Sequence, residues 1–358
     1  MDSIVTHGGR MVDYEVIARK SRDDITDFSA NINPYAPPAS VTTAILQNIY
    51  KINDYPDPVS RRLRQIFSER YGVSKDCVFA ANGASEVIDL FLRVLRPKRV
   101  VLLEPSFSEY AHAAKRNLIP TKKITMASDF CLPIYSIKDT LRKGDLLVIN
   151  TPHNPSGRFY SRSELEVIYE LILQCGAYAM IDEAFIDFVD GGEEHSSLPL
   201  VHSHIVVVRS LTKMYGIAGL RLGFGVADQK IVDHIVQMRD GWSVNLLAEE
   251  AGIAALQDHS FAMKTREWLR EERNDCMKQL EKIHGVIVYP SSANFLLVDG
   301  SFGGLHVAKW QEKLTKIGFF VRDCASYGTF TPSVFRMAIL HHHKNAILID
   351  ELASELSS

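Results

Sequence analysis

Short apolar runs, rich in β-branched residues, recur through the middle of this chain and are separated by longer segments with helical periodicity. Continuous apolar runs of this length are typical of strands that are buried on both faces. Strands that alternate with helices predict parallel βαβ units. We therefore expect an α/β fold between about residues 75 and 240, in which helices cover both faces of a large, mixed but mostly parallel sheet. The predicted strands are Val100–Leu103, Leu146–Ile149, Ala177–Ile181 and Ile205–Val208, and the predicted helices include Glu164–Leu173 and Ile231–Met238.

The regions on either side of this α/β pattern predict a second, smaller unit. Residues 1–40 are rich in Asn, Pro and Ser, which favours an extended arm that joins the small domain. Residues 243–284 have a helical pattern, and a further helix is expected near residues 305–317. With 358 residues, about two domains are expected. We predict a large domain at 41–245 and a small α+β domain at 246–358. Its short strand-like runs are Val286–Tyr289, Phe295–Val298, Phe319–Arg322 and Phe335–Leu340.

Composition excludes several classes of protein. The 40 basic and 43 acidic residues leave a net charge of -3, so the chain offers no strong positive field for nucleic acid. No apolar run approaches the 18 residues of a membrane span, and the first residues do not resemble a signal peptide. The five cysteines are widely spaced and form no CxxC pair, which favours a reducing, cytoplasmic compartment.

Two polar motifs that follow predicted strands could hold an anion and a ligand oxygen. Asn82-Gly83-Ala84-Ser85 precedes a predicted helix, so its backbone N–H groups and the serine hydroxyl could bind an anion. A plain helix cap by Ser85 is the alternative. The run from Asn150 to Gly157 contains two prolines and forms a rigid turn that could aim the Asn154 amide at a ligand. A loop that merely leads into a helix is the alternative.

Two further motifs supply an acid and an amine. Asp182 directly follows a predicted strand, where its carboxylate could keep a cationic ring nitrogen protonated, although a cap or a surface salt bridge would also explain it. In Ser210-Leu211-Thr212-Lys213, a lysine follows two hydroxyl-bearing residues, with Arg221 beyond it. A nearby cation and partial burial keep such an amine nucleophilic, whereas a surface lysine in a glycine-rich loop is the alternative. Together the four motifs provide the groups that pyridoxal 5'-phosphate requires.

The chain resembles the fold-type-I pyridoxal-phosphate enzymes of the class I/II aminotransferase superfamily. The resemblance runs from about residue 5 to residue 340. It is strongest to the branch that holds histidinol-phosphate aminotransferases and threonine-phosphate decarboxylases. Besides the four motifs, it rests on His7-Gly8-Gly9, on the run from Asp27 to Pro34, on Asp54-Tyr55-Pro56-Asp57, on Glu104 to Tyr110 and on Val321-Arg322-Asp323-Cys324.

The resemblance implies a cofactor site and a homodimer. Lys213 would form the Schiff base, Asp182 would bind the ring nitrogen and Phe107 would stack on the ring. Tyr55 would reach the cofactor phosphate of the neighbouring subunit, so that the two active sites of the dimer are composite. The cofactor-binding residues implied in this way are Tyr55, Gly83, Ala84, Ser85, Phe107, Asn154, Asp182, Ser210, Thr212, Lys213 and Arg221.

The resemblance also implies a small phosphorylated amino acid as substrate. Arg336 would take its α-carboxylate, and Arg322 with the His7-Gly8-Gly9 arm would take its phosphate, although either arginine could instead be a surface cation at a strand end. The implied substrate-binding residues are His7, Gly8, Gly9, Asn31, Asn154, Arg322 and Arg336.

Three segments depart from the family pattern. Phe185 replaces a tyrosine that many relatives place beside the ring oxygen, so Asn154 is expected to act there with less help. Ser326–Val334 lacks the expected glycine-rich run. We interpret His341-His342-His343 as a surface cluster and expect no metal there.

The residues alone leave the reaction open. The bond that breaks at Cα is the one held perpendicular to the cofactor ring, and either arginine could hold either pose. The resemblance favours decarboxylation of L-threonine O-3-phosphate, or of phosphoserine, to an amino-alcohol phosphate for cobalamin biosynthesis. The alternatives are an aminotransferase, such as one that acts on histidinol phosphate, and a non-catalytic protein that binds a ligand or regulates.

Overall fold

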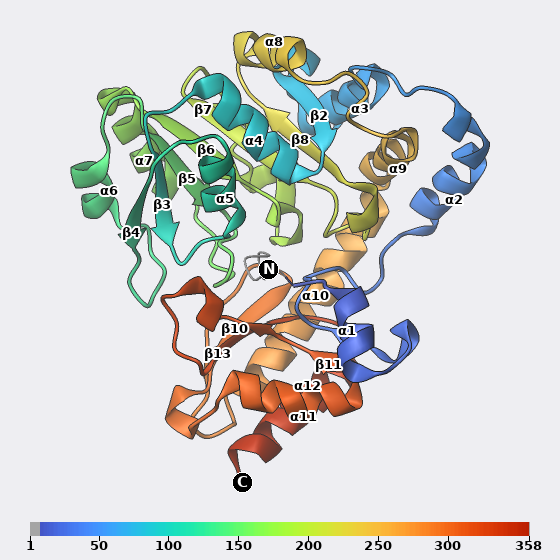
Figure 1. Cartoon of the computed structure of the whole chain (residues 1–358), viewed down its shortest axis with the longest axis vertical. Helices are drawn as coiled ribbons and strands as arrows, with labels where there is room; N and C mark the ends of the chain where they lie inside the picture. The colour runs from blue at the N-terminus through green and yellow to red at the C-terminus, as the bar shows by residue number, and fades with distance from the viewer. Residues whose placement is uncertain (1–7, 358) are drawn as a thin grey trace.

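The structure is a computed structural model that describes residues 8–357, and its largest element is a seven-stranded sheet (Figure 1). The strand order is β2-β8-β7-β6-β5-β3-β4. Only β8 runs antiparallel to its neighbours, so the expected mostly parallel α/β sheet is confirmed. The strands are β2 (Val78–Asn82), β3 (Val100–Glu104), β4 (Thr121–Thr125), β5 (Leu146–Asn150), β6 (Tyr178–Asp182), β7 (Ile205–Ser210) and β8 (Leu222–Val226).

Helices cover both faces of this sheet because successive side chains of each strand point to opposite sides. Val100 and Leu102 belong to an apolar cluster with helices α4, α5 and α8, whereas Val101 and Leu103 belong to another with α3, α7 and α9. Both faces are therefore buried, which explains the continuous apolar runs of the strands. The helices are α2 (Ala39–Asn48), α3 (Arg61–Tyr71), α4 (Ala84–Leu95), α5 (Glu109–Arg116), α6 (Ile134–Thr140), α7 (Arg162–Cys175), α8 (Gln229–Met238) and α9 (Leu246–Gln257).

A second, antiparallel sheet of order β12-β13-β10-β9 occupies the lower half of Figure 1. The helical segment predicted from residue 243 is divided at Asp258, whose carboxylate accepts a hydrogen bond from the Phe261 backbone and begins a new helix. The elements are α10 (His259–Leu280), β9 (Ile287–Val288), β10 (Phe295–Asp299), α11 (Val307–Ile317), β12 (Arg322–Asp323), β13 (Val334–Ala338) and α12 (His342–Leu356).

The composition of the N-terminal arm predicted an extended segment, but the arm is not extended throughout, because Met11–Ala18 forms helix α1. The Asn, Pro and Ser residues that suggested an extended arm lie outside this stretch. Tyr14 of α1 stacks on Phe320, with ring centroids 4.0 Å apart. Beyond it, β1 (Thr26–Asp27) pairs in parallel with β11 (Phe319–Phe320). The arm is thus attached to the smaller part of the molecule, although the domain boundaries at residues 41 and 246 stay predictions.

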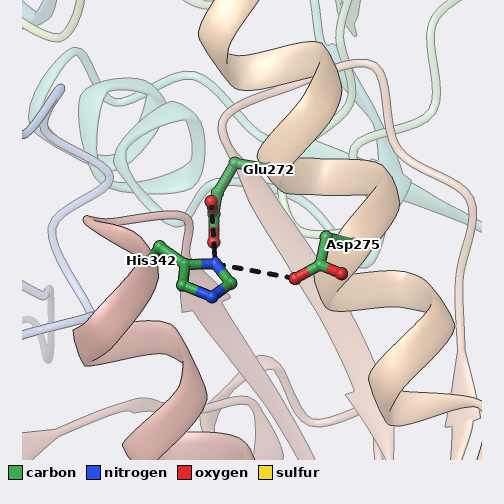
Figure 2. Close-up of side chains that lie close together, drawn as sticks. All are labelled: Glu272, Asp275 and His342. Atoms are coloured by element: carbon green, nitrogen blue, oxygen red, sulfur yellow. Dashed lines mark hydrogen bonds and ion pairs between the residues drawn. The ribbon is translucent and has the colours of Figure 1, made fainter.

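The histidine cluster takes part in the packing of α12 against α10. His342 Nδ1 lies 3.3 Å from a carboxylate oxygen of Glu272 and 3.6 Å from one of Asp275 (Figure 2). Asn345 donates a further hydrogen bond to Glu272 at 2.8 Å. These groups are of the types that bind metal ions, but hydrogen bonds between two helices account for their arrangement, and none of them lines the cavity described below. The absence of a metal there stays a prediction.

None of the helices between residues 8 and 357 is long and apolar enough to cross a membrane.

Candidate functional site

A cavity opens at the carboxyl ends of β5, β6 and β7 and is closed by residues from the smaller sheet and the arm. Parallel strands bring these ends to one edge, where Asn150 pairs with Asp182 and Asp182 pairs with Val208 in the register. The predicted residues that line the cavity are Gly8, Asn31, Ala84, Ser85, Phe107, Asn154, Asp182, Ser210, Thr212, Lys213, Arg221, Arg322 and Arg336. The structure therefore brings most of the predicted site together.

The N-terminus of α4 forms a tightly packed cradle at one end of the cavity. Gly83 has a φ of +85°, and a Cβ there would lie 2.5 Å from a guanidinium nitrogen of Arg221. A Cβ on Gly223 would lie 2.5 Å from the backbone nitrogen of Ala84. Ser210 and Thr212 line the same cavity, and their hydroxyls are 2.9 Å apart. Free helix N–H groups, hydroxyls and a guanidinium together fit a phosphate group. Gly83 shapes this cradle without lining the cavity.

Lys213 projects into the cavity from the turn that follows β7. Its amine donates to the Ala30 carbonyl at 3.2 Å. Desolvation, reinforced by Arg336 and Arg221, lowers the pKa of this amine to about 8. An amine with this pKa is about one-quarter neutral at pH 7.5, whereas an ordinary lysine is about one-thousandth neutral. The environment therefore keeps Lys213 nucleophilic, as the sequence predicted.

Asp182 is buried at the end of β6 and is held from two sides. Its oxygens accept hydrogen bonds from the Tyr110 hydroxyl at 2.6 Å and from the Ala184 backbone at 2.9 Å. Burial raises the pKa of this carboxyl to about 6, and the two hydrogen bonds oppose that increase. A cationic ring nitrogen beside it would compensate for the burial.

Tyr110 was not among the predicted site residues. It lies in α5, three positions after Phe107, which precedes that helix, and the two rings make an edge contact with centroids 5.5 Å apart.

Asn154 and Arg336 are joined at the wall between the two sheets. Arg336 donates to the side-chain oxygen of Asn154 and, at 2.7 Å, to the Ser29 carbonyl. The Asn154 backbone donates to Asn150 at 2.7 Å. Both side chains are buried, so Arg336 is not the surface cation that the sequence left open.

Arg322 lies beside Arg336 on the same face of the smaller sheet. The two residues are directly opposite each other across β12 and β13, which places their side chains on one side of the sheet. Arg322 donates to the Ser326 hydroxyl at 2.9 Å, and its guanidinium lies 5.6 Å from the ring centre of Tyr327. Two fixed cations therefore face one cavity, an arrangement that fits a substrate with two anionic groups.

The arm closes the cavity at Gly8. A Cβ on Gly8 would lie 2.2 Å from the Ser29 carbonyl oxygen, so only glycine allows this approach. Gly9 donates to the Ser29 hydroxyl at 2.9 Å but does not line the cavity. Asn31 is buried, and its side-chain oxygen has no hydrogen-bond partner within the described part of the chain. A buried polar atom in a cavity wall that has no partner in the protein is available to form a hydrogen bond with a ligand. His7 lies outside the described residues.

Tyr55 does not line this chain's own cavity. It is 84% exposed, and its ring contacts Trp242 with centroids 5.3 Å apart. Its predicted action on a neighbouring subunit stays a prediction.

The comparisons with known proteins agree with this geometry. The family model for aminotransferase class I and II matches residues 23–352. A threonine-phosphate decarboxylase from Salmonella typhimurium is 32% identical over 356 residues, which cover 98% of this chain and 96% of that protein. A histidinol-phosphate aminotransferase from Methanococcus aeolicus is 29% identical over 341 residues, which cover 91% of this chain and 89% of that protein.

A solved histidinol-phosphate aminotransferase from Clostridium acetobutylicum superposes with a TM-score of 0.85 at 26% identity, covering 92% of this chain and 98% of that one. The family match spans nearly the whole chain, and the strand ends carry the residues that the resemblance predicted. The chain belongs to the aminotransferase class I and II family.

Proposed function

We propose that this protein is a pyridoxal-phosphate-dependent decarboxylase of L-threonine O-3-phosphate or its close analogue phosphoserine. The observation that carries the substrate class is the pair of arginines, Arg322 and Arg336, which lie on one face of β12 and β13 and line the same cavity as Lys213 and Asp182. A phosphorylated amino acid has two anionic groups, and each arginine can bind one of them through a charge-assisted fork. Relatives named as threonine-phosphate decarboxylases support this choice.

The residues that would hold the cofactor fit its parts. The α4 cradle with Ser210, Thr212 and Arg221 suits the phosphate, Asn154 suits the ring oxygen and Asp182 suits the ring nitrogen. When bound, the cofactor supplies a sink for the electrons that are released at the substrate's Cα. In decarboxylation the Cα–carboxylate bond breaks, carbon dioxide leaves and a proton replaces it at Cα. Lys213, with its pKa near 8, carries a proton readily enough to deliver it there.

The arginine pair would decide which bond breaks. With the substrate phosphate on Arg322 and the carboxylate on Arg336, rotation about the bond between the substrate's Cα and its amino nitrogen is restricted. The carboxylate can therefore be held perpendicular to the cofactor ring. Holding Cα–H perpendicular instead would give transamination, with Lys213 as the base. The structural likeness to a histidinol-phosphate aminotransferase favours that second candidate.

Product analysis distinguishes the candidates. The protein, loaded with cofactor, is incubated separately with phosphothreonine, phosphoserine and histidinol phosphate, the last together with a keto-acid acceptor. We expect carbon dioxide and amino-alcohol phosphate from the first two, in yields that rank them, and no stoichiometric keto acid. Formation of a keto product without carbon dioxide would establish the aminotransferase. If neither product forms, the protein binds a ligand without catalysing a reaction.

We further propose a homodimer with composite sites through Tyr55. The support is a group of exposed apolar side chains near it in the sequence: Leu46, Ile49, Tyr50 and Ile52. Sedimentation should give a dimer. When Tyr55→Ala and Lys213→Ala proteins are unfolded, mixed equally and refolded, each mixed dimer should contain one intact site, which restores about one-quarter of the activity. No recovery above the separate variants would contradict shared sites. A cytoplasmic location stays a prediction.

A further inference from the structure

The loss of a tyrosine at position 185 raises the question of what holds Asn154. Phe185 is buried, and its ring packs edge-on against Phe295 with centroids 5.0 Å apart. It has no polar atom to offer the cofactor's ring oxygen. From the sequence, Asn154 was therefore expected to act there with less help.

The structure supplies a different tyrosine from a distant part of the chain. Tyr327 ends a short 3₁₀ helix, Ala325–Tyr327, inside the segment that departs from the family pattern. Its hydroxyl lies 3.3 Å from the side-chain oxygen of Asn154, and its ring lines the cavity. Burial raises the pKa of this phenol, so the hydroxyl stays protonated and can donate.

The orientation of the Asn154 amide follows from its two partners. A guanidinium has only donors, so the Asn154 atom that faces Arg336 must be the carbonyl oxygen. The same oxygen receives the Tyr327 hydroxyl. The NH₂ group then points away from both partners, and within the described residues it makes no hydrogen bond. It is left as the donor that the cavity presents to a ligand oxygen.

Tyr327 also contacts the substrate side of the cavity. The guanidinium of Arg322 lies 5.6 Å from its ring centre, within the range of a cation–π contact. One side chain therefore contacts both Arg322, the proposed phosphate-binding arginine, and Asn154, the proposed ring-oxygen donor.

We propose that Tyr327 is a positioning residue that holds the Asn154 amide with its N–H toward the cofactor's ring oxygen and takes the place of the tyrosine that is missing at position 185. The proposal rests on the proposed use of pyridoxal phosphate but not on the choice between decarboxylation and transamination. Tyr327 acts through Asn154 and does not itself touch the ring oxygen.

The test measures the resting protein without substrate. The visible absorbance of the lysine-bound cofactor titrates with pH, and a hydrogen bond to the ring oxygen lowers the midpoint because it stabilises the deprotonated oxygen. Tyr327→Phe keeps the ring beside Arg322 and removes only the hydroxyl. Its midpoint should rise by about 0.5 to 1 pH unit, the size of one ordinary hydrogen bond. Asn154→Ala should raise the midpoint at least as much.

The double variant separates positioning from a general structural effect. If Tyr327 acts through Asn154, adding Tyr327→Phe to Asn154→Ala should cause no further shift. Tyr289→Phe, a half-buried tyrosine outside the cavity, is the matched control and should leave the midpoint unchanged. In turnover, Tyr327→Phe should lower kcat more than it raises KM.

Several results would overturn the proposal. It falls if Tyr327→Phe leaves the midpoint unchanged, if Asn154→Ala causes no shift, or if the Tyr327→Phe shift persists in the Asn154→Ala background. The proposed function fails independently: a cofactor-loaded protein that releases no carbon dioxide from phosphothreonine can still show the Tyr327-dependent shift.

Discussion

Gly223 determines how closely helix α4 approaches the sheet, so replacing it tests the phosphate cradle directly. Gly223 lies in β8, paired with Ser210 on one side and Ala81 on the other. A Cβ there would meet the Ala84 nitrogen at 2.5 Å and the Gly83 carbonyl carbon at 2.7 Å. Both contacts are with backbone atoms, so no side-chain rotation can relieve them.

The expected loss follows from the displacement. Bringing the 2.5 Å contact to 3.4 Å, where ordinary van der Waals contact begins, requires a shift of about 0.9 Å. A hydrogen bond of ~2.8 Å from the helix N-terminus to a phosphate then lengthens beyond ~3.5 Å and is lost. One lost charge-assisted bond costs about 1.5–3 kcal/mol. Gly223→Ala should therefore weaken cofactor binding about 10- to 150-fold.

The assay is a titration of the cofactor-free protein with pyridoxal phosphate, followed by visible absorbance. Gly219→Ala, in the 3₁₀ helix Ala218–Leu220 just before β8, is the matched control, because no atom lies within 4 Å of the Cβ that it adds. The control should bind the cofactor normally. If Gly223→Ala folds, as judged by circular dichroism, and keeps the normal dissociation constant, the phosphate does not bind at the start of α4.

Three further predictions address the chemistry. Asp182→Asn should bind the cofactor but lose most activity, because an amide cannot hold the ring nitrogen protonated; near-normal turnover would mean that Asp182 has another role. Arg322→Ala should lower kcat/KM for phosphothreonine about ten- to a hundredfold and barely affect threonine, whereas equal losses on both substrates would remove the phosphate assignment. In the cofactor-free protein, attachment to Lys213 needs the neutral amine, whose pKa is about 8. Its rate should rise about tenfold per pH unit below pH 8 and level off above, and a rise that continues to pH 10 would contradict this pKa.

Local pattern was enough to predict the part of the site that lies on the strand ends. Asn154, Asp182 and Lys213 each follow an apolar run, and parallel strands must bring their carboxyl ends to one edge. The order and spacing of these residues therefore carried the cofactor chemistry before any contact was known. The helix α1 was missed because the composition of the whole arm concealed the short stretch Met11–Ala18.

The contacts that refine the site were beyond the reach of the sequence. Tyr110 donates to Asp182 across 72 residues, and Tyr327 meets Asn154 across 173. Neither pairing leaves a local periodicity, because each depends on how a helix or a second sheet packs onto the first. The pairing of Arg322 with Arg336 likewise depends on the register of β12 and β13.

The sequence by itself therefore determined the fold class and predicted candidates for the reacting groups, because short-range periodicity encodes the first and strand-end position indicates the second. Only the tertiary structure decided which donors orient Asn154 and Asp182 and how two arginines come to face one amine. Hydrogen-bond geometry and burial, which set those orientations and the pKa values of Asp182 and Lys213, exist only once distant segments are packed together.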